Sequence, residues 1–547
     1  MTRTCADAVV VGAGHHGLVA AAVLADAGWD VVVLEGQDDV GGAVRSRMGH
    51  PGFTVDRFSA FYPLGAASPV LRALDLAPHG LTWTHAPSVV AHPHGVDDER
   101  GAVLYRDPQR TADALAAANQ ADGPAWLALV EQWQRIREPL LDSLLTAWPP
   151  VRSATRLLAR LGTADALRLV RFMTLPATRM GEELFAGELG RRLLAGNAMH
   201  ADSPIDGAVS GTFGWLLMML GQDVGFPVPQ GGAGRLAEAL RSRAESAGAR
   251  VLTGDAVTSV VVSGGRAVGT RTAGGHEVVA RRAVLADVSL TALYGSLLPD
   301  AEVPARLRAD LQHFEWDLGT VKVDYALSGP VPWRAAGARG AGTVHVGADL
   351  DEDGTAIGAV EGLVRWNADL RSRRVPRAPF ALVGQMTTTD ASRSPAGTES
   401  MWAYTHVPKG MAGDDVAEQV AINMHDVLER HAPGFGELVL DRVVQRPSDL
   451  QGDDANLVGG AVNGGTSQLH QQLVFRPTPG PGGPRTVVDG LYLASAATHP
   501  GGGVHGACGY LAARAALRDG TPVLGALRRR TSSALLDLVY RPSRSVR

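Results

Sequence analysis

The chain begins with an alternation of apolar runs and a glycine turn. Ala8–Val11 is a short apolar run, Gly12–Gly17 is rich in glycine, and Leu18–Ala27 is an apolar segment long enough for a buried helix. A glycine ends that segment, and Asp30–Leu34 is a second, β-branched run that closes on Glu35. The pattern predicts a strand, a tight turn, a helix and a second strand, which together make a βαβ unit.

The rest of the chain continues with both element types. Residues 110–200 have apolar positions at helical spacing, interrupted by a double proline, so we expect mainly helices there. Further on, the pattern predicts helices over 236–247 and 510–517 and strands over 251–252, 257–262, 283–286, 318–327, 486–488 and 491–494. The apolar run 213–220 is far shorter than the ~20 residues that span a bilayer. A buried core helix is its simplest interpretation, with a substrate tunnel or a membrane contact as alternatives.

Composition narrows the class of protein. The 547 residues are 45% apolar and 20% charged, with a net charge of −5, so the chain can bury a large core and gives no reason to expect a nucleic-acid partner. The only cysteines, Cys5 and Cys508, stand at opposite ends, which excludes a disulfide framework, a cysteine-based zinc site and a dithiol redox pair. We predict no metal site. The first residues lack a secretory apolar core, so we expect a cytoplasmic protein.

The first glycine turn suits the pyrophosphate of a dinucleotide. Gly12 permits a tight turn out of the strand, Gly14 lets a pyrophosphate approach the backbone, and Gly17 allows the helix to pack closely on the sheet. Phosphate groups would then lie at the helix N-terminus, where N–H groups are free. Glu35 lies 18 residues beyond Gly17, close to the ~20 expected of a carboxylate that binds a ribose hydroxyl. A chance glycine turn is the alternative.

Other glycine groups favour FAD over NAD. Gly41-Gly42, followed by Arg45, resembles the extended FAD fingerprint of glutathione-reductase-like flavoproteins, and a plain surface turn is the alternative. Five glycines fall within residues 501–509, directly ahead of an Ala-rich helix. Such a run indicates backbone that lies against a flat or anionic ligand, and we expect the same of residues 231–234.

Three blocks carry a more specific resemblance: VVVGAGHHGLVAAAVLADAGWDVVVLE, VGGAVRS and GLYLASAATHPGGGVHGACGYLAARAA. They resemble the phytoene desaturase-like, carotenoid/retinoid oxidoreductase superfamily, and most closely its branch of pyridine nucleotide-disulfide oxidoreductase domain-containing proteins. The resemblance implies FAD as the cofactor and a backbone contact from Val257 to the adenine. His16 stands where the family has Asn, and it can still donate toward a phosphate. The expected FAD-binding residues are Gly12, Gly14, His15, His16, Gly17, Glu35, Gly41, Gly42, Arg45, Val257, Gly501, Gly502, Gly503 and Val504.

The order of elements and the resemblance together imply an α/β fold. We expect a Rossmann-like, glutathione-reductase-like FAD-binding domain that is interleaved with an α+β substrate domain carrying a helical cap. The FAD-binding domain is predicted over 1–100, 226–295 and 451–520, the helical cap over 101–225, the substrate-domain sheet over 296–450 and a basic tail over 521–547.

Candidates for catalysis are few. Residues 318–327 look like the strand of flavin amine oxidases in which a lysine holds a water at flavin N5, and Lys322 would be that lysine; a lysine extending from an edge strand is the alternative. His499 and His505 flank the C-terminal glycine run, with structural roles as the alternative. Asp287 stands where a predicted strand ends at the cofactor, or simply terminates that strand. Residues 402, 404 and 406 alternate, so they share one face, as cavity wall or as core.

These motifs and the resemblance predict that the protein is an FAD-dependent oxidoreductase. By resemblance it dehydrogenates or isomerises a lipophilic, polyene- or isoprenoid-like small molecule by hydride transfer to flavin N5. A flavin amine oxidase that uses O2 is one alternative, and a flavin-binding regulatory protein with little turnover is another. The basic tail makes weak contact with a membrane surface conceivable, with a solvated terminal helix as the alternative.

Overall fold

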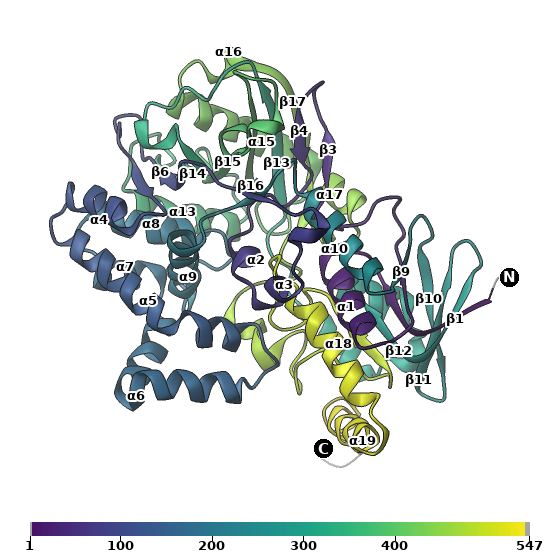
Figure 1. The fold of residues 1–547 in the computed structure, drawn as a ribbon. Helices are drawn as coiled ribbons and strands as arrows, with labels where there is room; N and C mark the ends of the chain where they lie inside the picture. Colours follow the sequence, from purple (N-terminus) through teal and green to yellow (C-terminus); the bar gives the residue numbers. More distant parts are fainter. Residues whose placement is uncertain (1–2, 542–547) are drawn as a thin grey trace.

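The computed structural model describes residues 3–541 and contains two seven-stranded sheets (Figure 1). The first sheet has the order β10-β11-β12-β1-β2-β9, and β18 also pairs with β12. β18, β12, β1, β2 and β9 run parallel, whereas β10 and β11 extend the sheet as antiparallel strands. The strands are β1 (Arg3–Val11), β2 (Val31–Leu34), β9 (Arg250–Leu252), β10 (Val257–Ser263), β11 (Arg266–Thr272), β12 (Glu277–Ala286) and β18 (Leu491–Leu493).

The parallel part of this sheet is buried on both faces, which is why its strands are continuous apolar runs. Ala8 and Val10 of β1 pack in one cluster with α1 (His15–Asp26), α10 (Gly234–Ser246) and α18 (Ala507–Asp519). Val9 and Val11 belong to a second cluster, which includes the segment 290–307 and the C-terminal α19 (Pro522–Tyr540). Helices therefore cover both faces of a doubly wound sheet.

The second sheet has the order β17-β13-β16-β15-β14-β6-β7 and is antiparallel except where β6 pairs with β14. α15 (Asp414–His431) packs on it through Val420, Met424 and Leu428, and α13 (Ala359–Arg371) lies beside the helix α8 (Glu188–Ala198) of the cap. The strands are β6 (Ser88–His92), β7 (Ala102–Leu104), β13 (Thr320–Leu327), β14 (Ala341–Val346), β15 (Ala381–Gln385), β16 (Glu399–His406) and β17 (Val439–Gln445).

The helical cap lies over one end of the second sheet (Figure 1). Its helices are α4 (Pro108–Ala116), α5 (Asp122–Leu144), α6 (Val151–Thr174), α7 (Ala177–Leu184), α8 (Glu188–Ala198) and α9 (Ser210–Asp223). The run 213–220 lies in α9, where Trp215 is fully buried and meets Trp133 edge to face at 5.7 Å. The core interpretation of this run is confirmed. Between residues 3 and 541, no helix is both long and apolar enough to cross a bilayer.

Short elements connect these layers. Two-stranded pairs join β3 (Ser46–Met48) to β4 (Thr54–Asp56) and β5 (Trp83–Thr84) to β8 (Val228–Pro229). The short helices are α2 (Pro63–Ala67), α3 (Pro69–Ala73), α11 (Leu290–Ala292), α12 (Ala305–Leu311), α14 (Met386–Thr389), α16 (Phe435–Leu438) and α17 (Pro447–Asp453).

The predicted fold class is confirmed, with two corrections of detail. The first sheet takes its strands from residues 3–34, 250–286 and 491–493, so the two domains are interleaved. The boundary predicted at residue 100 is wrong, because β6 lies before it and pairs with β14 of the second sheet. Residues 486–488 form no strand, since their backbone turns back to hydrogen-bond near Leu491. The last six residues of the predicted tail, 542–547, lie outside the described residues.

Candidate functional site

The predicted glycine positions of the N-terminal segment come together at the end of β1. Gly12 has a positive φ of 93°, and Gly14 is the N-cap of α1 and provides no side-chain cap. Gly41 reaches the same turn, since its N–H donates to the carbonyl of Ala13 at 2.8 Å. A Cβ on Gly42 would lie 3.3 Å from Cα of Gly14. The two glycine segments therefore bring backbone together in front of the helix N-terminus.

Glu35 stands at one side of this turn. Its Oε2 accepts a hydrogen bond from the N–H of Ala13 at 2.6 Å, so the carboxylate is held beside the glycines. The Glu35 carbonyl accepts from the N–H of Asp255 at 3.1 Å, and a Cβ on Gly36 would lie 3.1 Å from Cβ of Ala256. Val257, the next residue, therefore starts β10 at the same edge of the site.

Asp287 closes the turn from the end of β12. Its Oδ2 accepts from the N–H of Gly17 at 2.8 Å, and a Cβ on Gly14 would lie 2.6 Å from that oxygen. Burial raises the pKa of Asp287 to about 8 against the lowering effect of the Gly17 hydrogen bond, and the nearby Asp454 and Glu35 carboxylates raise it further. The structure thus places Asp287 against the glycine turn, so this residue does more than terminate its strand.

Two residues of the site carry no motif that the sequence reveals. Asp454 is half-buried across from Gly42, with its Oδ2 3.4 Å from the position of a Cβ there, and desolvation raises its pKa. Asn456 donates from its side chain to the Asp287 carbonyl at 3.2 Å and accepts from the N–H of Ser289 at 2.6 Å. Both lie in an irregular loop far along the chain, and only the fold brings them here.

Arg45 joins the same loop to the diglycine. Its Nε donates to the Gly42 carbonyl at 2.9 Å and its Nη2 donates to the Asp453 carbonyl at 2.5 Å. The guanidinium is buried, and it lowers the pKa of Asp454 against the effect of burial. Arg45 therefore orients the diglycine and supplies positive charge beside it.

The C-terminal glycine run meets the first turn at the N-termini of α1 and α18. Gly501 and Gly503 have φ values of 105° and 115°, and the carbonyl of Val504 lies 2.9 Å from where a Cβ on Gly65 would stand. Gly502 is in close contact with Asn463. Gly509 has a different purpose, because it lets α18 pack directly on the backbone of α1. Part of the run is thus an irregular loop with positive φ values, and part of it serves helix packing.

Buried imidazoles fill the junction of these loops. The rings of His15 and His16 are 3.9 Å apart, and those of His16 and His505 are 5.2 Å apart. Burial lowers the pKa of His15 to about 4 and that of His16 further below its usual range, so both are neutral near pH 7. Nε2 of His15 and both ring nitrogens of His16 have no partner within residues 3–541. These nitrogens are available to a ligand.

The two histidines proposed for catalysis have protein partners. His499 Nε2 lies 3.0 Å from the Thr146 carbonyl, and burial lowers its pKa. His505 accepts from the N–H of Ala507 at Nδ1, 3.0 Å away, and its Nε2 faces the Gly501 carbonyl at 3.3 Å. Ligand atoms of His16, His505 and Cys508 lie within 4.8 Å of one another, but the Nδ1 lone pair of His505 is already used.

Lys322 is buried and fully paired. It projects from β13, and its ammonium donates to the Asp56 carbonyl at 2.9 Å, to Gln445 at 3.3 Å and to the Asp324 carboxylate. The interpretation as an edge-strand lysine is wrong, because β13 lies between β16 and β17. Its three N–H groups are satisfied by protein, and a role at the flavin stays a prediction.

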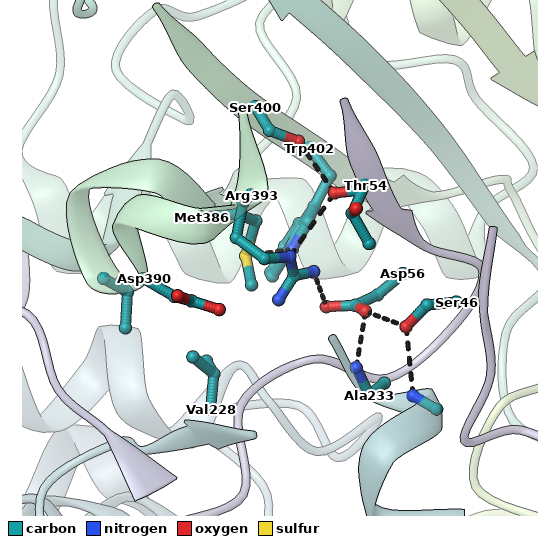
Figure 2. Close-up of polar contacts among 12 residues, drawn as sticks. Ser46, Thr54, Asp56, Val228, Ala233, Met386, Asp390, Arg393, Ser400 and Trp402 are labelled. Carbon is teal, nitrogen blue, oxygen red and sulfur yellow. Dashed lines mark hydrogen bonds and ion pairs between the residues drawn. The ribbon is translucent and has the colours of Figure 1, made fainter. Parts of the chain in front are cut away.

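A buried ion pair next to Lys322 joins the two domains (Figure 2). Asp56 and Arg393 are both fully buried, with Oδ2 and Nη2 2.5 Å apart. The other carboxylate oxygen accepts from Ser46 Oγ at 2.7 Å and from the N–H of Ala233 at 2.8 Å. Asp390 accepts from the N–H of Gly231 at 2.7 Å. Protein groups therefore take up these N–H donors, and the expectation that residues 231–234 face the cofactor stays a prediction.

Aromatic side chains pack in a cluster beside this network, and their role as the wall of a substrate cavity stays a prediction. Trp402 stacks on Tyr404 with ring centroids 5.8 Å apart, and Tyr404 meets His406 at 5.9 Å. The predicted shared face is confirmed, and Phe61 adds an edge contact to Trp402 at 6.0 Å. The surrounding cluster is apolar and draws on the FAD-binding segments, the cap and the second sheet; its buried members include Ala60, Ala198, Met199, Val228, Trp366, Phe380 and Met386.

The glycine cradle, the helix N-terminus, the free imidazole nitrogens and Glu35 fit the pyrophosphate and ribose of FAD. Together with the interleaved second domain, they define a two-domain FAD-dependent oxidoreductase. The chain belongs to the family of flavin containing amine oxidoreductases, whose model matches residues 17–395.

Known proteins are similar to this chain over almost its whole length. A rat protein called pyridine nucleotide-disulfide oxidoreductase domain-containing protein 2 is 28% identical, over 94% of this chain and 93% of its own. A zeta-carotene-forming phytoene desaturase of Myxococcus xanthus is 26% identical, over 91% and 90%. The crystal structure of an oxidoreductase from Methanosarcina mazei shares the fold, with a TM-score of 0.59, 15% identity and coverage of 93% and 99%. These findings confirm the expected superfamily and the FAD cofactor.

Proposed function

We propose that the enzyme dehydrogenates or isomerises a lipophilic, polyene- or isoprenoid-like molecule. The observation that carries this proposal is the apolar and aromatic wall formed by Phe61, Trp402, Tyr404 and their neighbours. Two ion pairs lie beside it, Lys322 with Asp324 and Arg393 with Asp56. Such a surface suits an uncharged, apolar substrate. The desaturase from Myxococcus xanthus, whose name refers to a carotene, supports the same class of substrate.

We also propose which residues hold the cofactor. The backbone of Gly12, Gly14, Gly17, Gly41 and Gly42 would face the pyrophosphate, with His15 and His16 donating from the helix N-terminus. Glu35 would bind a ribose hydroxyl, Arg45 would hold the diglycine in place, and Val257 would face the adenine. Gly501, Gly502, Gly503 and Val504 would lie against the flavin. FAD supplies the acceptor for the hydride at N5; the protein orients the substrate carbon and excludes water.

A flavin amine oxidase is the second candidate. The nearly parallel rings of Trp402 and Tyr404, 27° apart, offer aromatic faces that attract a cation such as a protonated amine. The Asp56 and Asp324 carboxylates beside these rings already have cationic partners, so neither of the two is free to pair with such a cation. That difference favours the apolar substrate.

Anaerobic mixing of the FAD-loaded enzyme with candidate substrates tests the proposal. Loss of the visible flavin absorbance with polyenes or isoprenoids, and not with primary amines, is the expected result. Reduction by amines alone, with peroxide released on admission of O2, would establish the amine oxidase instead. An enzyme that binds FAD and reacts with neither class would be a flavin-binding protein with little turnover.

A further inference from the structure

Arg476 is a fully buried guanidinium that has no carboxylate as a direct partner. The residue is only 1% exposed, and within residues 3–541 its side chain forms no ion pair. Burial lowers the pKa of Arg476, but a guanidinium stays protonated at neutral pH. Because the burial of a cation without a carboxylate partner is costly, other groups must compensate for it.

Backbone carbonyls satisfy the N–H groups of this guanidinium. Nε and Nη2 both donate to the carbonyl of Ala496, at 3.1 and 2.8 Å. Nη1 donates to the carbonyl of Thr466 at 3.0 Å, and Nη2 also donates to that of Gly464 at 3.0 Å. Arg476 therefore joins the loop 463–466 to the segment that follows β18. Carbonyls are neutral, so these contacts leave a full positive charge in place.

The charge lies directly behind the C-terminal glycine run. A Cβ on Gly501 would lie 3.2 Å from Cζ of Arg476. A Cβ on Gly502 would lie 2.6 Å from the carbonyl oxygen of Asn463, which accepts from Nη2 of Arg476 at 3.2 Å. Since both residues are glycines, they place no side chain between the guanidinium and a ligand on the other face of the run.

Two carboxylates hold the same loop and act on Arg476 from beyond contact. Asp317 accepts from the N–H of Asn463 at 2.9 Å. Asp202 accepts from the N–H of Ser467 at 2.7 Å. Burial, with a further contribution from Asp202, raises the pKa of Asp317 to about 6. Asp317 is therefore ionised at pH 8, where it offsets part of the positive potential of the guanidinium.

We propose that the positive charge of Arg476 stabilises the reduced flavin relative to the oxidised flavin and so raises its reduction potential. The inference rests on the proposed placement of residues 501–504 against the flavin. In a dehydrogenation, a C–H bond of the substrate breaks and its hydrogen nucleus and two electrons form a bond at N5, so the ring gains one negative charge. The substrate then loses a proton to complete its double bond. Arg476 contacts neither reactant, so it is a positioning residue that acts across the loop.

The midpoint potential of the bound flavin, measured by spectroelectrochemical titration at pH 8, tests the proposal without any substrate. The FAD-loaded parent should have a potential above that of free FAD, because it should bind the reduced form more tightly. Arg476→Met removes the charge and should cut this preference about tenfold, which lowers the potential of a two-electron couple by about 30 mV. Arg476→Lys keeps the charge but not all the carbonyl contacts, so it should unfold at a lower temperature and still keep most of the potential.

Two further variants separate charge from structure. Arg191, like Arg476, donates to backbone carbonyls, those of Phe185 and Ala186 in the cap. Arg191→Met is therefore the matched control and should leave the potential unchanged. Asp317→Asn removes a negative charge beside the same loop, so it should raise the potential, and this result does not depend on whether Arg476→Met folds.

Three results would overturn the proposal. They are a parent potential at or below that of free FAD, equal shifts in the Met and Lys variants of Arg476, and a potential that stays constant or falls in Asp317→Asn. Failure of the proposed function has a different signature. An enzyme that is reduced by amines and not by polyenes would contradict the proposed substrate and leave these differences in potential intact.

Discussion

Replacing Arg393 by Met should destabilise the protein by about 3 kcal/mol. Met keeps the apolar stem of the side chain but leaves the Asp56 carboxylate buried without its cation. Breaking a buried ion pair from one side typically costs about 3–5 kcal/mol. The low end applies here, because Ser46 and the N–H of Ala233 still donate to Asp56. The loss is measured as the free energy of unfolding in urea, followed by circular dichroism.

A second substitution isolates the charge as the cause. Asp56→Asn in the Arg393→Met background removes the stranded charge while Oδ1 of the new side chain can still accept from Ser46 and Ala233. The double variant should therefore recover about 2 kcal/mol relative to Arg393→Met. The reasoning is refuted if Arg393→Met costs less than about 1 kcal/mol, or if the double variant is no more stable than the single one.

Three further predictions concern the cofactor site. Gly14→Ala should weaken FAD binding, measured by quenching of flavin fluorescence, because its Cβ would lie 2.6 Å from Asp287 Oδ2; Gly295→Ala, whose Cβ would meet nothing within 4 Å, is the control and should bind FAD unchanged. The raised pKa of Asp287, about 8, means that the folded state holds a proton that the unfolded state loses near pH 4. Its stabilising contribution is thus complete below pH 4 and declines by about 1.4 kcal/mol per pH unit up to about pH 8; Asp287→Asn should flatten this decline in unfolding measurements, and an unchanged slope would contradict the assignment. Lys322→Met should lower the unfolding free energy because the Asp324 carboxylate loses its ammonium partner, and adding Asp324→Asn should restore that free energy. Slower flavin reoxidation in this double variant would support the predicted role of Lys322 at the flavin. Unchanged reoxidation would show that the lysine is purely structural.

Local chemistry made the FAD half of the site predictable from sequence. Gly12, Gly14 and Glu35 lie within one βαβ unit, so their spacing alone determines that they meet. Asp454 and Asn456 could not be found in this way, because nothing in their loop signals a site and only long-range packing brings them to Asp287. The same holds for Arg393, which reaches Asp56 across 337 positions of sequence.

Glycine clusters were the least reliable signal. Gly501 and Gly503 have the positive φ that such a run predicts, but residues 231–234 face Asp390, Asp56 and Ser46. A glycine is needed wherever backbone approaches anything closely, whether a ligand, a helix or a neighbouring domain. Sequence alone does not distinguish these partners.

Interleaving also determines when the cofactor can be taken up. The proposed FAD cradle combines the turn at Gly12, the strand end at Asp287 and the loop at Gly501, which are made in that order and lie far apart in the sequence. A nascent chain therefore has no complete cradle until the loop at Gly501 is made. Because FAD then binds only the folded protein, it stabilises all three segments at once, and a shortage of the cofactor should appear first as poor survival of newly made chains.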